Sequence, residues 1–216
     1  MLDTQAIALS LTLAFWTLVL LIPFGIWVAH RLADAGSWKS WAEAALALPL
    51  VLPPTVLGYY FIVVFAGKSL FGEPLVFSFT GLLIASLIVN LPFAIQPIQR
   101  AFEAIPPEIK EAAKVSGLNT WQRFRLIELP LAWRGILSGA AMTFAHTLGE
   151  FGVVLMVGGA IPGETKTASI AIYDKVQTFD TAGAGSLSLI LLIISLIAIA
   201  VSYGVFGKPQ TGSQRA

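Results

Sequence analysis

The chain of 216 residues contains no cysteine and few charged residues. Without cysteine, disulfides, thiolate metal sites and cysteine nucleophiles are excluded. Only 12% of the residues are charged, against about 25% in soluble domains, and 56% are hydrophobic. This composition lies outside the soluble globular class. Because the apolar residues occur in blocks, it predicts an integral membrane domain.

Five apolar stretches reach the roughly 20 residues that a helix needs to cross a bilayer. The first stretch follows Asp3, has no Lys or Arg before it, and is longer than a signal-peptide core, so we interpret it as an uncleaved span. The fold class is therefore predicted as an all-α, polytopic membrane protein. Its domain is expected to cover residues 6–206, with spans at 7–29, 44–66, 79–98, 135–158 and 186–206.

Basic residues are distributed unequally between the two sets of loops that five spans create. One set holds only Lys68, Lys166 and Lys175. The other set holds ten basic residues: Arg31, Lys39, Arg100, Lys110, Lys114, Arg123, Arg125, Arg134, Lys208 and Arg215. Because basic loops stay in the cytoplasm, the N-terminus is predicted outside, and the C-terminus with its tail at 207–216 is predicted in the cytoplasm.

The fourth span is rich in small residues, among them Gly135, Gly139 and Gly149. Small residues let another membrane helix approach closely. Close helix packing is the favoured interpretation, and a pore lining against a second subunit is the alternative. Between the fourth and fifth spans, residues 165–180 are too short and too charged to cross a membrane, so a short helix in the outer mouth is expected.

A charged segment at 106–130 reads PPEIKEAAKVSGLNTWQRFRLIELP and separates two apolar spans. Its two leading prolines predict the start of a helix, because proline suits the first helical turn. Gly117 predicts the end of that helix, since glycine readily adopts the left-handed conformation. Asn119 or Thr120 is expected to cap a second helix, and Pro130 to stop it.

Three interpretations of this helix–turn–helix compete: a solvated loop, a DNA-binding element, and a docking element for a cytoplasmic protein. The spacing of Ala113 and Gly117 is often seen in DNA-binding helix–turn–helix modules. A helix tethered between two spans would be hard to place in a major groove, so no nucleic-acid partner is expected. Glu111 offers a charged anchor, and Ala112 and Ala113 leave a shallow surface. These features favour docking.

The pattern Glu111-Ala112-Ala113, Gly117, then Ile127, Leu129 and Pro130 resembles the signature loop of type I binding-protein-dependent ABC importer permeases. In that family the loop forms a coupling helix in a cleft of the ATPase subunit. The resemblance therefore implies a coupling loop at 100–134, a cytoplasmic ABC ATPase as partner, and no enzymatic activity in this chain. The residues it assigns to ATPase coupling are Glu111, Ala112, Ala113, Gly117 and Leu118.

Two other stretches narrow the resemblance. Residues 147–152 (TLGEFG), together with 161–167 (IPGETKT), are similar to molybdate permeases, and so is the run at 48–59. Sulfate and thiosulfate permeases share Gly-Glu-Phe-Gly but are less similar to the segment at 161–167. Tungstate permeases are a nearer alternative, because tungstate is almost the same size and charge as molybdate. The resemblance implies the permease of an ATP-driven molybdate importer in the bacterial cytoplasmic (inner) membrane. The residues alone support only a membrane subunit driven by a partner.

This interpretation directs attention to the spans that carry unusual residues. Pro53 and Thr55 lie where prolines interrupt the second span, and Glu150 lies in the fourth span, one turn after His146. We take Pro53, Thr55 and Glu150 as candidates for the translocation path or its gate, with Glu150 accepting hydrogen bonds from nearby backbone or hydroxyl groups. A simple interfacial carboxylate is the alternative. Two ligands are too few for a metal site, so neither a metal nor another cofactor is expected.

The remaining expectations concern partners. Five spans are too few to enclose a solute path comfortably, so two copies are expected to form a homodimer. The outer loop at 159–180 is the candidate surface for a periplasmic or extracytoplasmic oxyanion-binding protein, with Pro162, Gly163 and Glu164 as contacts. Membrane lipid is expected around the aromatic residues Phe15, Trp16, Trp27, Trp38, Trp41, Tyr59 and Tyr60.

Two other classes of protein fit less well. An ion-coupled secondary transporter or channel predicts charged residues paired within spans and repeats between the two halves, and the sequence displays neither. A membrane enzyme needs a nucleophile and a base that converge. The two histidines, His30 and His146, are expected at different depths and have no such partner in the sequence.

Overall fold

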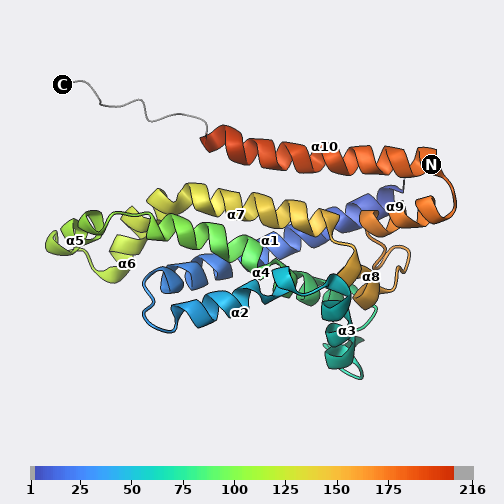
Figure 1. Ribbon diagram of the computed structural model, residues 1–216, viewed down its shortest axis with the longest axis horizontal. Coiled ribbons are helices and arrows are strands. Elements are labelled where there is room, and N and C mark those ends of the chain that lie inside the picture. Colours follow the sequence, from blue (N-terminus) through green and yellow to red (C-terminus); the bar gives the residue numbers. More distant parts are fainter. Residues whose placement is uncertain (1–2, 207–216) are drawn as a thin grey trace.

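The computed structural model describes residues 3–206, so the predicted tail at 207–216 lies outside the described residues. Three long helices form the centre of the molecule and run along its longest axis (Figure 1): α1 (Thr4–Ala33), α4 (Phe79–Glu103) and α7 (Leu129–Gly149). The prediction of an all-α fold is confirmed for the spans. Within residues 3–206 the strands are limited to a small antiparallel hairpin of β1 (Ser69–Leu70) and β2 (Glu73–Pro74).

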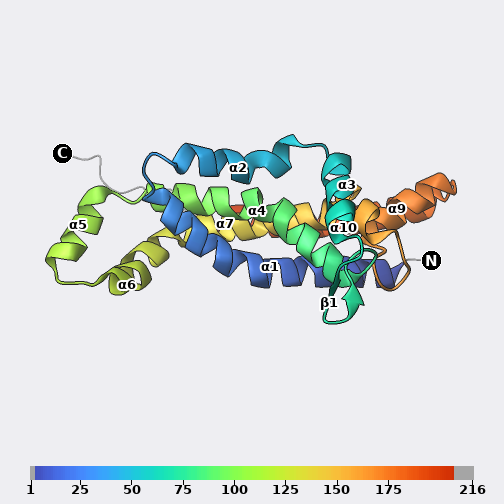
Figure 2. The ribbon, with the colours of Figure 1, turned by 90° about the horizontal axis from the view of Figure 1, so that it is seen from below.

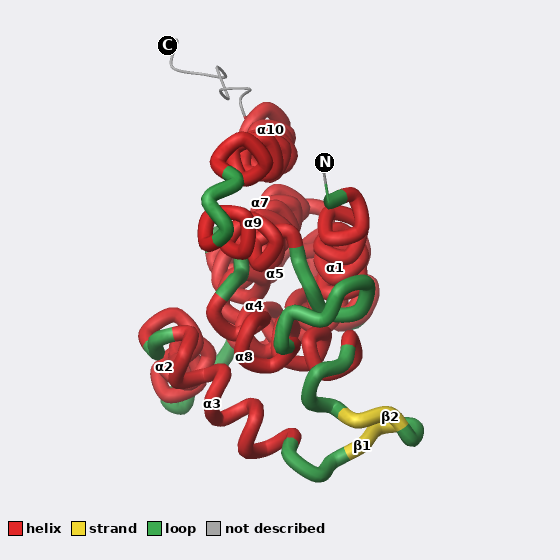
Figure 3. Tube along the Cα trace, turned by 90° about the vertical axis from the view of Figure 1, so that its right-hand side faces the viewer, coloured by secondary structure: helices red, strands yellow, loops and turns green. Residues whose placement is uncertain are grey.

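Three of the five predicted spans are single helices that are long and apolar enough to cross a membrane: α1, α4 and the first 21 residues of α10 (Thr181–Phe206). The other two predicted spans are pairs of helices joined at a sharp bend, so the described residues offer three straight candidate spans, or up to five if each bent pair counts as one. The outermost of these is α10, which packs on α7 and stands at the edge of the molecule in the end-on view of Figure 3.

The second predicted span, 44–66, is not one straight helix. It consists of α2 (Lys39–Val51) and α3 (Pro54–Phe65), which meet at 103° (Figure 2). Leu52 and Pro53 are extended, with ψ angles of 136° and 138°. The physical reason is the Pro53–Pro54 pair, since a residue before proline is pushed out of the helical region and prolines donate no helical hydrogen bond.

The fourth predicted span, 135–158, is also divided. The chain is helical from Thr120 to Gly149, through α6 (Thr120–Arg123), a π-helix η1 (Phe124–Glu128) and α7, and then bends by 59° into α8 (Gly152–Gly158). The expectation that Pro130 stops a helix is wrong. Pro130 lies in the first turn of α7, where the missing N–H and fixed φ of proline are tolerated.

The small residues of α7 pack against α4 within the same chain, which confirms the favoured interpretation. A Cβ on Gly139 would lie 2.7 Å from the backbone oxygen of Ala94, and one on Gly135 would lie 2.8 Å from that of Pro97. These contacts leave no room for a side chain, so glycine sets the distance between the two helices. The shorter helix predicted within 165–180 is also confirmed, as α9 (Ala168–Gln177).

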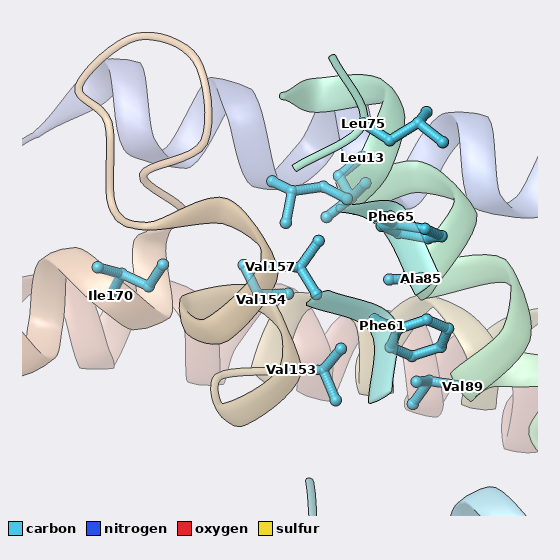
Figure 4. Packing of buried hydrophobic residues seen from close by; sticks show 11 residues of the cluster. Leu13, Phe61, Phe65, Leu75, Ala85, Val89, Val153, Val154, Val157 and Ile170 are labelled. Carbon is cyan, nitrogen blue, oxygen red and sulfur yellow. The ribbon is translucent and has the colours of Figure 1, made fainter. Parts of the chain in front are cut away.

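An apolar cluster fills the end of the molecule where the two bent pairs meet (Figure 4). Phe61 and Phe65 of α3 pack there with Val153 and Val157 of α8, Leu82, Ala85 and Val89 of α4, and Leu13 of α1. Phe61 and Val153 are buried, and Val157 is fully enclosed. The cluster therefore joins the two broken spans to the central helices.

Candidate gate and coupling loop

The breaks of the two bent pairs lie against each other. A Cβ on Gly152, directly after the second break, would lie 2.6 Å from Cβ of Pro54, directly after the first. The structure thereby brings together the segments that carry the predicted gate residues. Pro53 and Thr55 are exposed beside this contact, whereas the Glu150 side chain is only 9% exposed.

Glu150 holds the second break through three groups. Its Oε1 accepts a hydrogen bond of 3.1 Å from the backbone N–H of Val153, one of the free donors at the start of α8. Its backbone oxygen accepts a hydrogen bond of 2.7 Å from Oγ of Ser169 in α9. Its Oε2 lies 3.6 Å from Nε2 of His146. The expected hydrogen bonding of Glu150 to nearby backbone is confirmed.

His146 extends this site into a chain of polar side chains across the bundle. Its Nδ1 lies 3.1 Å from Oδ1 of Asn90, and Asn90 Nδ2 donates to the backbone oxygen of Ser86 at 2.8 Å. The hydroxyls of Ser86 and Thr17 lie 2.9 Å apart. Sequence reasoning missed Ser86, Thr17 and this role of Asn90. The available signal was one asparagine in the middle of an apolar span, which needs polar partners in a membrane.

The hydrogen bonds of Asn90 assign the proton on His146. Because Nδ2 of Asn90 donates to Ser86, Oδ1 faces the imidazole, and an amide oxygen only accepts. The proton therefore lies on Nδ1 of His146. Its Nε2 faces the Glu150 carboxylate, so a second proton turns the pair into an ion pair, while a neutral ring directs a lone pair at the carboxylate. Within residues 3–206, no group of three or more His, Asp or Glu is placed to hold a metal ion.

The predicted coupling loop forms at the opposite end of the molecule from α8 (Figure 1), as α5 (Pro107–Val115) followed by α6. Gly117 ends α5 with φ +79°, as predicted, and the N–H of Leu118 reaches the carbonyl of Ala113 at 3.2 Å. Asn119 starts α6 with a complete capping box to Gln122, also as predicted.

One expectation about the surface of this loop is wrong. Glu111 and Ala112 are exposed and Leu118 is half-buried, but Ala113 is 4% exposed, so its side chain does not add to a docking surface. Ala113 lies on the inner face of the short amphipathic helix α5, and its backbone carbonyl accepts the N–H of Leu118 at the turn. Val115, which sequence reasoning did not single out, is 90% exposed on the same loop.

Two side-chain contacts join the coupling loop to the end of α1. Nζ of Lys110 in α5 lies 2.9 Å from Asp34, and fully buried Glu128 of η1 lies 2.6 Å from Nε2 of His30 and 2.7 Å from Nε of Arg123. Burial raises the pKa of Asp34, but the hydrogen bond and charge of Lys110, with His30 and Arg123 nearby, outweigh it and lower that pKa overall. The coupling loop and the end of α1 are therefore held together by side chains of α5 and η1.

The loop between α8 and α9 carries Pro162, Gly163 and Glu164, and all three are exposed; their contact with a binding protein stays a prediction. Thr165 fixes this loop, since its fully buried hydroxyl donates to Gly158 O at 2.6 Å and accepts from Ile161 N at 2.9 Å. A second feature at this end was missed. The β1–β2 hairpin carries Phe71, which is 98% exposed, at its tip.

The architecture and the two sites define a membrane protein that works through partners. A family profile described as "Binding-protein-dependent transport system inner membrane component" matches residues 21–207. The chain belongs to this family, and it is the multi-pass permease part of an inner-membrane ABC importer rather than a catalytic subunit. An ATPase and a binding protein are the partners that this class implies.

Individual relatives agree with this class. The molybdenum transport system permease protein ModB of Azotobacter vinelandii is 41% identical in an alignment of 210 positions that covers 93% of each chain. The sulfate transport system permease protein CysT of Escherichia coli strain K12 is 29% identical in an alignment of 180 positions that covers 80% of this chain and 64% of the relative. A bacterial alginate ABC transporter, solved in complex with its periplasmic protein, has a chain of the same fold, with TM-score 0.74, 18% identity, and coverage of 92% of this chain and 76% of that chain.

Proposed function

We propose that this chain is the permease subunit of an ATP-driven molybdate importer, which moves the oxyanion by alternating access. The observation that carries the proposal is the 41% identity to a molybdenum permease over 93% of both chains. The sulfate permease is 29% identical and only 64% of it is matched, which favours molybdate over sulfate. Tungstate, an oxyanion of almost the same size and charge, is the alternative that the uptake experiment below addresses.

The proposed membrane domain, residues 6–206, has its N-terminus outside and its C-terminus inside, with the coupling loop at 100–134 in the cytoplasm. The ten-to-three division of basic residues supports this direction. A homodimer is supported by the open surroundings of His146. This residue lines a surface hollow of about 370 Å³ between α4, α7 and α10 rather than an enclosed path, and we propose that a second copy closes it.

Coupling to the ATPase is assigned to Glu111, Ala112, Ala113, Gly117 and Leu118, joined by Val115. The exposed members contact the ATPase, and Ala113 and Gly117 shape the turn that presents them. When the ATPase subunits close on ATP, the loops of the two copies move together. The Lys110–Asp34 and Glu128–His30 contacts carry that movement to α1.

The gate is assigned to the region where the two breaks meet, with Pro53, Thr55 and Glu150 as its residues. Helices that end inside a membrane domain expose backbone groups that hydrogen-bond a polar solute, and the described spans place no unpaired Lys or Arg there to trap an anion. On the outside, Pro162, Gly163 and Glu164 are proposed to contact the loaded binding protein, and Phe71 of the hairpin projects from the same end.

Competition during uptake tests the proposal. Cells that lack their own high-affinity molybdate system receive this chain with its ATPase and binding protein, and accumulated molybdenum is measured from trace molybdate. We expect uptake to persist in excess sulfate, to fall with excess tungstate, and to vanish with an ATPase variant that cannot hydrolyse ATP. If excess sulfate abolishes molybdenum uptake, the chain is assigned to the sulfate permeases instead. Uptake without ATP hydrolysis contradicts an ATP-driven importer altogether.

A further inference from the structure

A hollow of about 860 Å³ lies between the end of α1 and the α6–η1 segment, near the coupling loop. We call it the α1–α6 groove, and its principal lining residues are Pro23, Ile26, Trp27, Arg31, Trp121 and Phe124. A second hollow of about 520 Å³ adjoins it and shares Trp27 and Arg31. Each volume lies within the usual range of ligand pockets.

The walls of the groove change from apolar to cationic along α1. Pro23, Trp27 and Arg31 are spaced four residues apart, so they lie on one helix face, and all three are exposed. Ile26 and Phe124 continue the apolar part. Along this face of α1 the side chains therefore change from the apolar Pro23 to the indole of Trp27 and then to the guanidinium of Arg31. The same order is met in a bilayer on going from the acyl chains to the phosphates.

Arg31 supplies a positive charge that the protein leaves available. Its guanidinium carbon lies 5.8 Å from the centre of the Trp27 ring, and it forms no ion pair in the part of the chain that the structure describes. The other charges that line the groove are matched within the protein. Arg123 and His30 contact Glu128, and Asp34 contacts Lys110. The groove thus has a surplus of one cation beside an apolar wall.

Two exposed indoles flank this charge. Trp27 is 58% exposed and Trp121 is 65% exposed, one on each side of the groove. Indoles that expose an apolar face and an N–H group concentrate at the level of lipid head groups. A soluble partner protein would be expected to match Arg31 with an acidic side chain, but it would not explain an apolar wall at Pro23 and Ile26 within the first predicted span.

We propose that the α1–α6 groove binds one anionic phospholipid of the cytoplasmic leaflet, with its phosphate at Arg31 and an acyl chain along Pro23, Ile26 and Phe124. The proposal uses the membrane direction proposed above and does not depend on which oxyanion is transported. Because His30 and Arg123 line the groove and hold Glu128 of η1, the lipid would contact the elements that link α1 to the coupling loop.

The test is lipid binding by the complete transporter, purified in detergent and titrated with phosphatidylglycerol or with phosphatidylcholine of identical acyl chains. Bound lipid is counted by native mass spectrometry, without molybdate. We expect phosphatidylglycerol to bind about fivefold more tightly, the effect of one cation near an anionic lipid. Arg31→Ala should remove this preference, and Arg31→Lys should retain part of it.

The matched control is Arg134→Ala, which removes an exposed arginine of α7 that does not line the groove. If the two lipids bind equally tightly, or if Arg134→Ala loses the preference for phosphatidylglycerol as fully as Arg31→Ala does, the site is overturned. Non-specific attraction between basic residues and anionic lipid would then explain the binding. Displacement of phosphatidylglycerol by glycerol phosphate would assign a small-anion site instead. Binding that appears only after removal of the ATPase would make the groove a protein interface. Since none of these readouts involves uptake, a failure here is distinct from a failure of the proposed import function.

Discussion

At the residue scale, Glu150 is the group on which the interactions at the second break converge. It contacts α7 through His146, α8 through the N–H of Val153, and α9 through Ser169. A glutamine has the same length and an oxygen that can accept from Val153, but it lacks the charge that faces His146. The two roles of the Glu150 side chain, accepting a hydrogen bond from the backbone and placing a charge opposite His146, can therefore be separated by substitution.

We expect Glu150→Gln to unfold close to the parent temperature and Glu150→Ala to be destabilised by about 1 kcal/mol, the usual effect of losing a helix cap. Thermal unfolding of the detergent-purified protein measures this difference. Uptake should fall in both variants, because both remove the charge opposite His146. Full uptake in Glu150→Gln would show that the charge has no part in the gate.

Glu128 is the second residue whose loss should be severe. It is fully buried between His30 and Arg123, so Glu128→Ala leaves a cation without its partner inside the protein. We expect a destabilisation of about 3–5 kcal/mol, measured as lost yield and a lowered unfolding temperature. Glu73→Ala, which removes an exposed carboxylate on β2, is the control and should change neither. Equal behaviour of the two variants would contradict the structural role of Glu128.

At the element scale, the distance between α4 and α7 is set by backbone contacts at glycine. Gly139→Ala places a methyl group 2.7 Å from the carbonyl oxygen of Ala94, so the helices must separate. Gly149→Ala is the matched change on the same helix, because nothing lies within 4 Å of its Cβ.

Gly139→Ala should therefore destabilise the protein by about 1–3 kcal/mol, as overpacking does. Gly149→Ala should be neutral or slightly stabilising, since alanine favours a helix. Unfolding temperatures of the two variants, compared with the parent, give the result. A stabilised Gly139→Ala would mean that α4 and α7 are not held at this distance.

The same scale explains which elements could be predicted from the sequence. The long apolar runs of α1, α4 and α10 depend on composition alone, and the Gly117 and Asn119 ends of α5 and α6 depend on local backbone chemistry, so these predictions are confirmed. The 103° turn at Pro53 was not predicted, because prolines show where a helix breaks but not by how much. The polar chain from Thr17 to His146 joins residues far apart in sequence, and no local sequence pattern predicts such contacts.

At the scale of the whole molecule, the proposed coupling role requires that this loop keep its shape against the ATPase. Gly117 has a φ of +79° and nothing lies within 4 Å of a Cβ placed there. A larger residue at this position therefore strains the backbone without causing a clash. Gly36 is the matched position, a glycine with equally open surroundings and no strained φ, in the loop before α2.

We expect Gly117→Val to lower uptake at least about tenfold while ATP hydrolysis continues, since a left-handed β-branched residue costs about 1–2 kcal/mol and distorts the loop. Gly36→Val should transport normally. Uptake and ATPase activity are measured on the same membranes, with expression of both variants verified. Normal uptake in Gly117→Val would mean that the loop is merely solvated.

The five-residue π-helix at Phe124–Glu128 has a consequence for the direction in which the coupling loop points. A π turn accommodates one residue more than an α turn, so the helix before it is rotated about its axis relative to the helix after it. Each residue of an α-helix turns the chain by about 100°. Loss of a single residue from this segment would leave the bundle beyond Leu129 intact and swing α5 and α6 round to a different side. The π-helix therefore fixes the direction in which α5 and α6 point relative to α7.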